Sequence, residues 1–69
     1  MEIKGRCKKI ENRDKQNGFA TFLFECFDDN KTIRAIGPMA EPKEMQMYVL
    51  DGDMDANGFF RFGYSRPFS

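Results

Sequence analysis

The stretch DKQNGFATFLF, residues 14–24, runs from a polar turn into a segment that is apolar at nearly every position. The dipeptide Asn17-Gly18 favours a β-hairpin turn, so a strand is expected to follow it. Successive side chains of a strand point to opposite faces, and a soluble strand usually keeps one face polar. Two alternating sets result here: Ala20, Phe22, Phe24 and Cys26 on one face, and Phe19, Thr21, Leu23, Glu25 and Phe27 on the other.

The face that carries Thr21 and Glu25 is the more polar one, so we predict that it is the exterior. That exterior still displays Phe19 and Leu23. Small five-stranded barrels of the OB type bind oligonucleotides on their second and third strands, where aromatic side chains stack on bases. The alternative is that a strongly coiled strand belongs to two parts of the core, or packs on a neighbouring domain.

Strand signals recur at short intervals along the rest of the chain. Phenylalanine, which favours strands, occurs eight times, and no stretch shows the apolar spacing of a capped amphipathic helix. The predicted strands are 2–11, 19–27, 32–37, 45–54 and 59–64. Turns are expected at 28–30 and 55–58, and a loop at 38–44, because Pro38 and Pro42 are unfit for a central strand.

The first predicted strand changes its apolar parity. Ile3, Gly5 and Cys7 share one parity, whereas Ile10 has the other. A change of parity indicates a bulge or a sharp bend, and a glycine within a strand permits another backbone to approach closely. We therefore expect this strand to bend and to approach a neighbour at Gly5.

Five strands joined mainly by hairpins predict an all-β fold, a small five-stranded OB-like barrel that is mostly antiparallel, with little or no helix. Closure removes the exposed sheet edges that a chain of 69 residues could hardly protect. A chain this short buries only about 60% of the surface that its unfolded form exposes. Its stability is therefore expected to be marginal. Residues 1–69 are read as a single OB-like domain.

The residue types offer little for catalysis or for metal binding. Histidine is absent, which removes the commonest general base and the usual triads. Cys7 and Cys26 lack CxxC spacing and have no histidine beside them, so they do not form an ordinary zinc ligand set. We expect both to be reduced; the alternative is one disulfide between them if their strands are neighbours. We expect no enzyme activity, no cofactor and no metal.

The segment DGDMDANG, residues 51–58, has aspartates at positions 1, 3 and 5 of an EF-hand loop. Ala56 and Phe62 occupy the positions that the loop reserves for glycine and glutamate. The segment is therefore expected to be an acidic strand end before a hairpin turn. No stretch approaches the roughly 20 apolar residues of a membrane span, and the N-terminus has no signal-peptide core. We expect a cytoplasmic protein without a membrane partner.

Charge is zero overall but unevenly spread. Residues 1–18 carry six basic and three acidic side chains, and residues 41–55 carry one basic and five acidic ones. A tight, sequence-blind DNA binder would be more positive, so only a weak or local contact with single-stranded DNA is expected. Basic side chains would contact phosphates, and Phe19 or Phe22 would stack on bases, which contributes about 1–3 kcal/mol per base. The candidate residues are Arg6, Lys8, Arg13, Lys15, Phe19, Phe22, Arg34 and Arg61.

Two other interpretations of these residues stay open. The basic side chains can simply be solvated surface charges. Apolar surface combined with a neutral, dipolar charge pattern also suits a protein–protein docking or oligomerisation module that binds no nucleic acid.

Several stretches together resemble the N-terminal OB-like domain of RecD-like DNA helicases, the exodeoxyribonuclease V alpha-subunit homologues. They are IKGRCKKIENRDKQNGFATFLF, TIRAIGPM, YVLDGDM and NGFFRF. The positions that match the family's glycine and hydrophobic pattern are Gly5, Ile10, Asn17, Gly18, Phe19, Ile36, Gly37, Met39, Leu50, Gly52 and Met54. Some positions depart from the pattern. Met54 is bulky but replaces the usual aromatic residue, Phe60 and Arg61 occupy positions where the family prefers arginine and glutamine, and Pro42-Lys43 occupies the place of Pro-Gly.

The resemblance implies a non-catalytic accessory domain at the start of a longer DNA-repair helicase, with downstream helicase domains or another protein chain as partners. The segment itself has no G-x-x-x-x-G-K-[ST] sequence, so it holds no ATPase site. GRCKKI and NGFATF also resemble the opening of cold-shock domains, which we attribute to shared barrel geometry.

Overall fold

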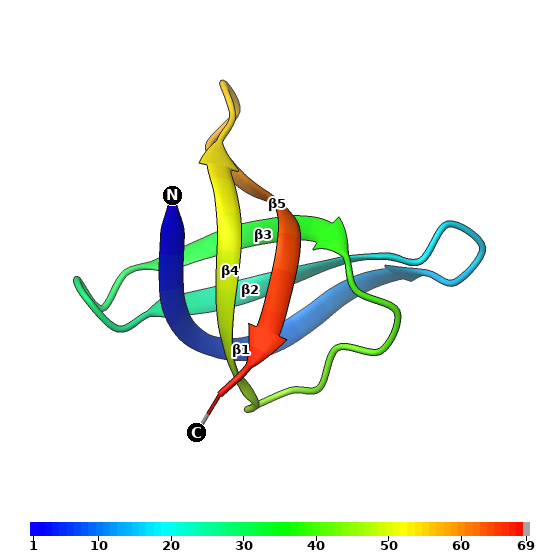
Figure 1. Ribbon diagram of the computed structural model, residues 1–69, viewed down its shortest axis with the longest axis horizontal. Helices are drawn as coiled ribbons and strands as arrows, with labels where there is room; N and C mark the ends of the chain where they lie inside the picture. The colour runs from blue at the N-terminus through cyan, green and yellow to red at the C-terminus, as the bar shows by residue number, and fades with distance from the viewer. Residues whose placement is uncertain (69) are drawn as a thin grey trace.

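The computed structural model describes residues 1–68, which form five strands and no helix. In chain order these are β1 (Glu2–Asp14), β2 (Phe19–Cys26), β3 (Thr32–Pro38), β4 (Met47–Met54) and β5 (Phe59–Pro67). They close into one barrel in the order β1-β2-β3-β5-β4, and β4 pairs with β1 to complete it (Figure 1). The pairing of β3 with β5 is parallel and the other four are antiparallel. The predicted OB-like barrel is confirmed.

Strand boundaries differ from the prediction where local geometry intervenes. The strand β1 continues to Asp14 because it pairs with β2 as far as Phe19. The hairpin turn between them spans four residues, with Gly18 at a φ of 71° and its N–H donating to the Asp14 carbonyl at 2.8 Å. The strand β4 starts at Met47, because Met45 has a φ of 71°, a left-handed conformation that extended strands do not contain.

The strand β1 bends as its parity change predicts. Its register against β2 shifts twice, between Cys7 and Lys9 and between Ile10 and Asn12. The first half pairs with both β2 and β4, whereas the second half extends with β2 into a long hairpin (Figure 1). At Gly5 a Cβ atom would lie 2.1 Å from the Glu25 carbonyl oxygen, so the predicted close approach is confirmed.

The core is built from the inward faces of all five strands. The face of β2 that was predicted to be interior is buried throughout, and Phe22 and Phe24 are completely inaccessible. Phe22 meets Phe24 edge-on, with ring centroids 6.1 Å apart, and Phe62 at 5.8 Å. Both cysteine thiols are free and buried, and burial raises the pKa of Cys7 to about 11.

The loop between β3 and β4 is fastened to the bulged part of β1. The Cys7 N–H donates to the Gln46 carbonyl at 3.0 Å, and the Met45 N–H donates to the Cys7 carbonyl at 2.6 Å. At the second bulge the Ile10 N–H donates to Glu44 Oε2 at 2.9 Å. These bonds satisfy backbone groups that a bulge takes out of the strand ladder. They also fix the position of the loop relative to β1.

The residues that the structure describes include no helix long and apolar enough to cross a membrane.

Candidate functional site

Strand pairing gathers exposed side chains on the outside of β2, β3 and β5. Directly paired residues point to the same side of a sheet. Phe19 pairs with Pro38, Thr21 with Ile36, and Leu23 with Arg34, while β5 adds Phe59 beside Arg34 and Arg61 beside Ile36. We call this surface the outer face; its members are Phe19, Thr21, Leu23, Arg34, Ile36, Phe59 and Arg61.

An exposed ring and a hollow mark one end of the outer face. Phe19 is 44% exposed, although β2 places it at the edge of a tightly packed barrel. Beside it lies an open hollow of about 480 Å³, which is lined by Asn12, Asp14, Asn17, Phe19, Thr21 and Ile36. The ring and the adjoining space give a planar ligand group room to stack.

Arg34 crosses the centre of the outer face and is held on two sides. Its Nε and Nη2 both donate to the Glu11 carboxylate, the second at 3.1 Å. Its guanidinium carbon lies 5.6 Å from the ring centroid of Phe59, which is within cation–π range. The hydrogen bond from Arg34 lowers the pKa of Glu11, and the same bond raises the pKa of Arg34. The pair holds the guanidinium beside the Phe59 ring and largely cancels its charge.

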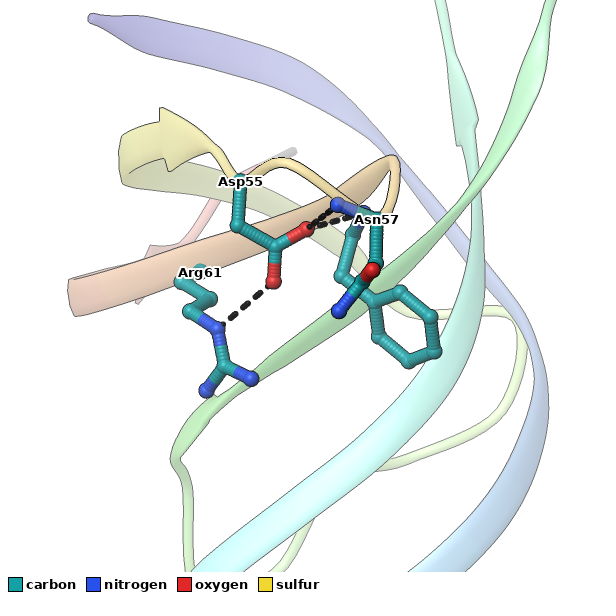
Figure 2. A network of polar contacts seen from close by, with 4 residues as sticks. Asp55, Asn57 and Arg61 are labelled. Carbon is teal, nitrogen blue, oxygen red and sulfur yellow. Dashed lines mark hydrogen bonds and ion pairs between the residues drawn. The ribbon is translucent and has the colours of Figure 1, made fainter.

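Arg61 is held in a similar way by the turn between β4 and β5. Asp55 Oδ1 accepts the N–H groups of Asn57 at 2.8 Å and Phe59 at 2.9 Å, while Oδ2 accepts Arg61 Nε at 2.7 Å (Figure 2). The backbone bond from Phe59, followed by the Arg61 side chain, lowers the pKa of Asp55. One carboxylate therefore shapes the turn and positions an arginine at the edge of the outer face.

Asp55, one of the three aspartates at EF-hand spacing, is engaged within the turn. Both of its oxygens already accept hydrogen bonds within the turn. Across residues 1–68, no group of three or more histidine, cysteine, aspartate or glutamate side chains is arranged to hold a metal ion.

The structure separates the eight predicted nucleic-acid contacts into distinct places. Phe19, Arg34 and Arg61 lie together on the outer face. Phe22 must be corrected: its side chain is completely buried among Phe24 and Phe62, so its ring cannot stack on a base in this fold. The alternation that exposes Phe19 is the reason that Phe22, three residues later, points inward.

Arg13 and Lys15 lie on the other side of the β1–β2 hairpin. Arg13 pairs with the buried Ala20, whereas Asp14 pairs with the exposed Phe19. Paired residues share a face, so Arg13 and Phe19 point to opposite sides of the hairpin. With the β3–β4 loop, this side encloses a cleft of about 550 Å³, lined by Arg13, Lys15, Ala40, Glu41, Pro42 and Lys43. We call it the hairpin–loop cleft.

Arg6 and Lys8 lie near the end of β2 that is opposite to Phe19. Arg6 pairs with Glu25, which lies six residues, or about 20 Å, along β2 from Phe19. Its guanidinium carbon lies 5.7 Å from the ring centroid of Phe27. Lys8 Nζ lies 3.9 Å from Glu25 Oε1. These two basic side chains adjoin the Leu23 end of the outer face, about 7 Å along β2 from it, and lie outside the hairpin–loop cleft.

Three residues that shape these places were missing from the candidates. Phe59 has the same parity as Arg61 in the sequence FFRF, so alternation alone could have placed it outside. Glu11 reaches an arginine two strands away because a bulge turns that part of β1, and the exact turn is not visible in the sequence. Lys43 lines the same cleft as Arg13 only because of the path of the β3–β4 loop, for which the sequence offers no signal.

In comparisons with known proteins, no family model, no curated protein and no solved structure matches the chain.

Proposed function

We propose that this chain is a non-catalytic OB-like binding module that contacts single-stranded DNA weakly through its outer face. The observation that carries the proposal is Phe19, 44% exposed beside an open hollow on the β2–β3 wall. That wall and the turns that flank it form the surface on which OB folds bind oligonucleotides. Phe59 and the flat guanidinium of Arg34 extend the stacking surface onto β3 and β5.

The expected affinity is low because stacking supplies most of it. One or two stacked bases contribute about 1–3 kcal/mol each, which corresponds to dissociation constants from tens of micromolar upward. Arg34 and Arg61 add little net attraction for phosphate while Glu11 and Asp55 neutralise them. The chain as a whole has no net charge to add.

Fluorescence anisotropy of a short labelled oligothymidylate at low salt tests the proposal. We expect a rise at about 100 μM protein. Phe19→Ala should abolish that rise without unfolding the domain, because the ring is largely outside the core. Tyr64→Ala is the matched control, since Tyr64 is also an exposed aromatic residue of the barrel, at 61% exposure, but pairs with Asp51 away from the outer face. A flat titration of the parent protein, or an equal loss in both variants, would reject the proposal.

We further propose that the module precedes the motor domains of a RecD-like helicase that acts in DNA repair in the cytoplasm. The support is the glycine and hydrophobic pattern that runs from β1 to β4, including Gly5 and Gly52, together with two free thiols of the kind found in reducing compartments. The reading frame downstream of this segment decides the matter: a Walker A motif supports the assignment, and a stop codon contradicts it.

Self-association is a second candidate, favoured by the same two ion pairs. Because Glu11 and Asp55 already neutralise Arg34 and Arg61, the outer face is nearly uncharged and suits contact with a second copy. Size-exclusion chromatography over a range of concentrations tests it. A concentration-dependent shift toward a dimer that Phe19→Ala removes would support this use of the face, and a constant monomer would exclude it.

A further inference from the structure

The hairpin–loop cleft gathers positive charge from two distant parts of the chain. Arg13 and Lys15 approach from the β1–β2 hairpin and Lys43 from the β3–β4 loop, around a space of about 550 Å³. Glu41 is the one acidic residue in the lining. In Figure 1 the hairpin and the loop lie on the same side of the barrel, with the hairpin extending beyond the wall.

The cations of the cleft have no acidic partner in the described chain. The four ion pairs of residues 1–68 involve the N-terminal amine, Lys8, Arg34 and Arg61. Arg13, Lys15 and Lys43 are exposed and take part in none of them. The lining therefore presents three positive charges against one negative charge.

Nearby acidic groups are already engaged by the backbone. Asp14 accepts hydrogen bonds from Asn17, with its Oδ2 2.8 Å from the amide nitrogen Nδ2, and these bonds lower the pKa of Asp14. Glu44 accepts the Ile10 N–H at the β1 bulge. Neither carboxylate forms an ion pair with a cation of the cleft within residues 1–68.

The backbone of the loop that carries Lys43 is held against β1 and β4 by hydrogen bonds. The Lys43 N–H donates to the hydroxyl of Tyr48 at 3.2 Å, and Pro42 beside it is buried. Met45 and Gln46 bind Cys7 on β1, the strand that also carries Arg13. Because the backbone is already in place, binding has to order only the side chains and loses less conformational entropy.

We propose that the hairpin–loop cleft is a phosphate-binding site for a phosphate-ester ligand of two or more linked phosphates. Lysine and arginine are the usual partners of phosphate oxygens, and the volume falls within the range of small-ligand pockets. The site lies across the hairpin from the outer face, so it goes beyond the proposed stacking surface and does not depend on it. The phosphates can belong to a free polyphosphate ester or to a nucleic-acid backbone.

A titration of the ¹⁵N-labelled protein with inorganic pyrophosphate, followed by heteronuclear NMR, tests the site. We expect shifts at the amides of residues 13–15, 40, 41 and 43, with little change at Phe19 and Phe59. A second titration with oligothymidylate distinguishes the sources. Shifts in the cleft with both probes support a backbone phosphate, and shifts there with pyrophosphate alone support a free phosphate ester.

Charge variants separate a built site from general surface charge. Lys43→Ala and Arg13→Ala should each weaken pyrophosphate binding about fivefold or more, because each removes one of three converging cations. Lys31→Ala is the control, since Lys31 is an exposed lysine in the β2–β3 turn. Absence of cleft shifts with pyrophosphate, or an equal loss in the Lys31 variant, would overturn the proposal. Neither outcome bears on oligonucleotide stacking at Phe19, which the anisotropy experiment reports.

Discussion

The outer face and the hairpin–loop cleft both present basic side chains, but they treat the charge differently. On the outer face Glu11 holds Arg34 and Asp55 holds Arg61. In the cleft, Arg13, Lys15 and Lys43 converge without such partners within residues 1–68. A paired arginine offers a fixed, flat surface with little net charge, whereas an unpaired cation offers attraction to phosphate. The outer face is therefore suited to stacking and the cleft to anion binding.

The phenyl ring of Phe22, which lies in the core beneath the outer face, should contribute most to the free energy of unfolding. Phe22→Ala removes a fully buried side chain that contacts Phe24 and Phe62, and such a change costs about 3–5 kcal/mol. Much of a domain this small would then be unfolded at room temperature. Phe19→Ala, three residues away on the opposite side of β2, should change the free energy of unfolding far less. Urea unfolding of the two variants measures the difference, and similar midpoints would show that β2 is not oriented as described.

A change at Gly5 should disturb the barrel and the hairpin–loop cleft together. The first half of β1 belongs to the barrel wall, and its second half carries Arg13 of the cleft. A Cβ atom at this position would lie 2.1 Å from a backbone oxygen of β2, which no side-chain adjustment can relieve. Overpacking of this kind costs about 1–3 kcal/mol or more, so Gly5→Ala should lower the thermal midpoint clearly. Gly63→Ala is the matched control, since no atom lies within 4 Å of its added methyl group. Equal melting curves for the two variants would contradict the close approach of β1 and β2.

Freeing Arg34 should make the outer face behave more like the cleft. Glu11→Gln removes the charge that pairs with Arg34, so the guanidinium becomes available to a phosphate. We expect oligothymidylate affinity to rise severalfold at low salt, and the slope of log affinity against log salt to steepen by about 0.7 for one added phosphate contact. Glu2→Gln makes the same change of charge on β1 but away from both regions, and should leave the slope unaltered. An unchanged slope in the Glu11 variant would mean that Arg34 does not face the ligand.

The sequence predicted the barrel better than it predicted the grouping of functional side chains. Alternation along β2 is a local property with a period of two, so it identified the buried face and the exposed Phe19 correctly. The parity change between Cys7 and Ile10 located the first bulge for the same reason, but the second bulge, between Ile10 and Asn12, was not predicted. Choosing Phe22 as a stacking residue was wrong because it went against that alternation.

The groupings depend on contacts between segments that are far apart in the sequence. Glu11 meets Arg34 because a bulge and two strand registers combine. Lys43 and Arg13 line the same cleft because Glu44 and Met45 bind β1. Neither arrangement follows from local periodicity, so the sequence could suggest single basic residues but could not sort them into a paired set and an unpaired set.

The smallest effect that we expect is a difference in acid sensitivity between the two regions. Glu11 and Asp55 have folded-state pKa values below their ordinary values of 4.5 and 3.8, because each accepts hydrogen bonds in the native state. A depressed carboxyl pKa stabilises the fold above the unfolded-state value, and that stabilisation is lost as the pH falls through the folded-state value. Urea midpoints should therefore decline below about pH 4.5, and Glu11→Gln and Asp55→Asn should flatten the decline.

A cleft variant provides the contrast for that measurement. Lys43→Ala removes a cation that pairs with no carboxylate in the described chain, so its acid limb should run parallel to that of the parent protein. Asp14, whose pKa is also lowered, leaves some slope in every variant. Parallel limbs for Glu11→Gln and the parent would mean that the pair with Arg34 contributes no pH-dependent stability, and the two regions would then differ in geometry but not in their electrostatic coupling to folding.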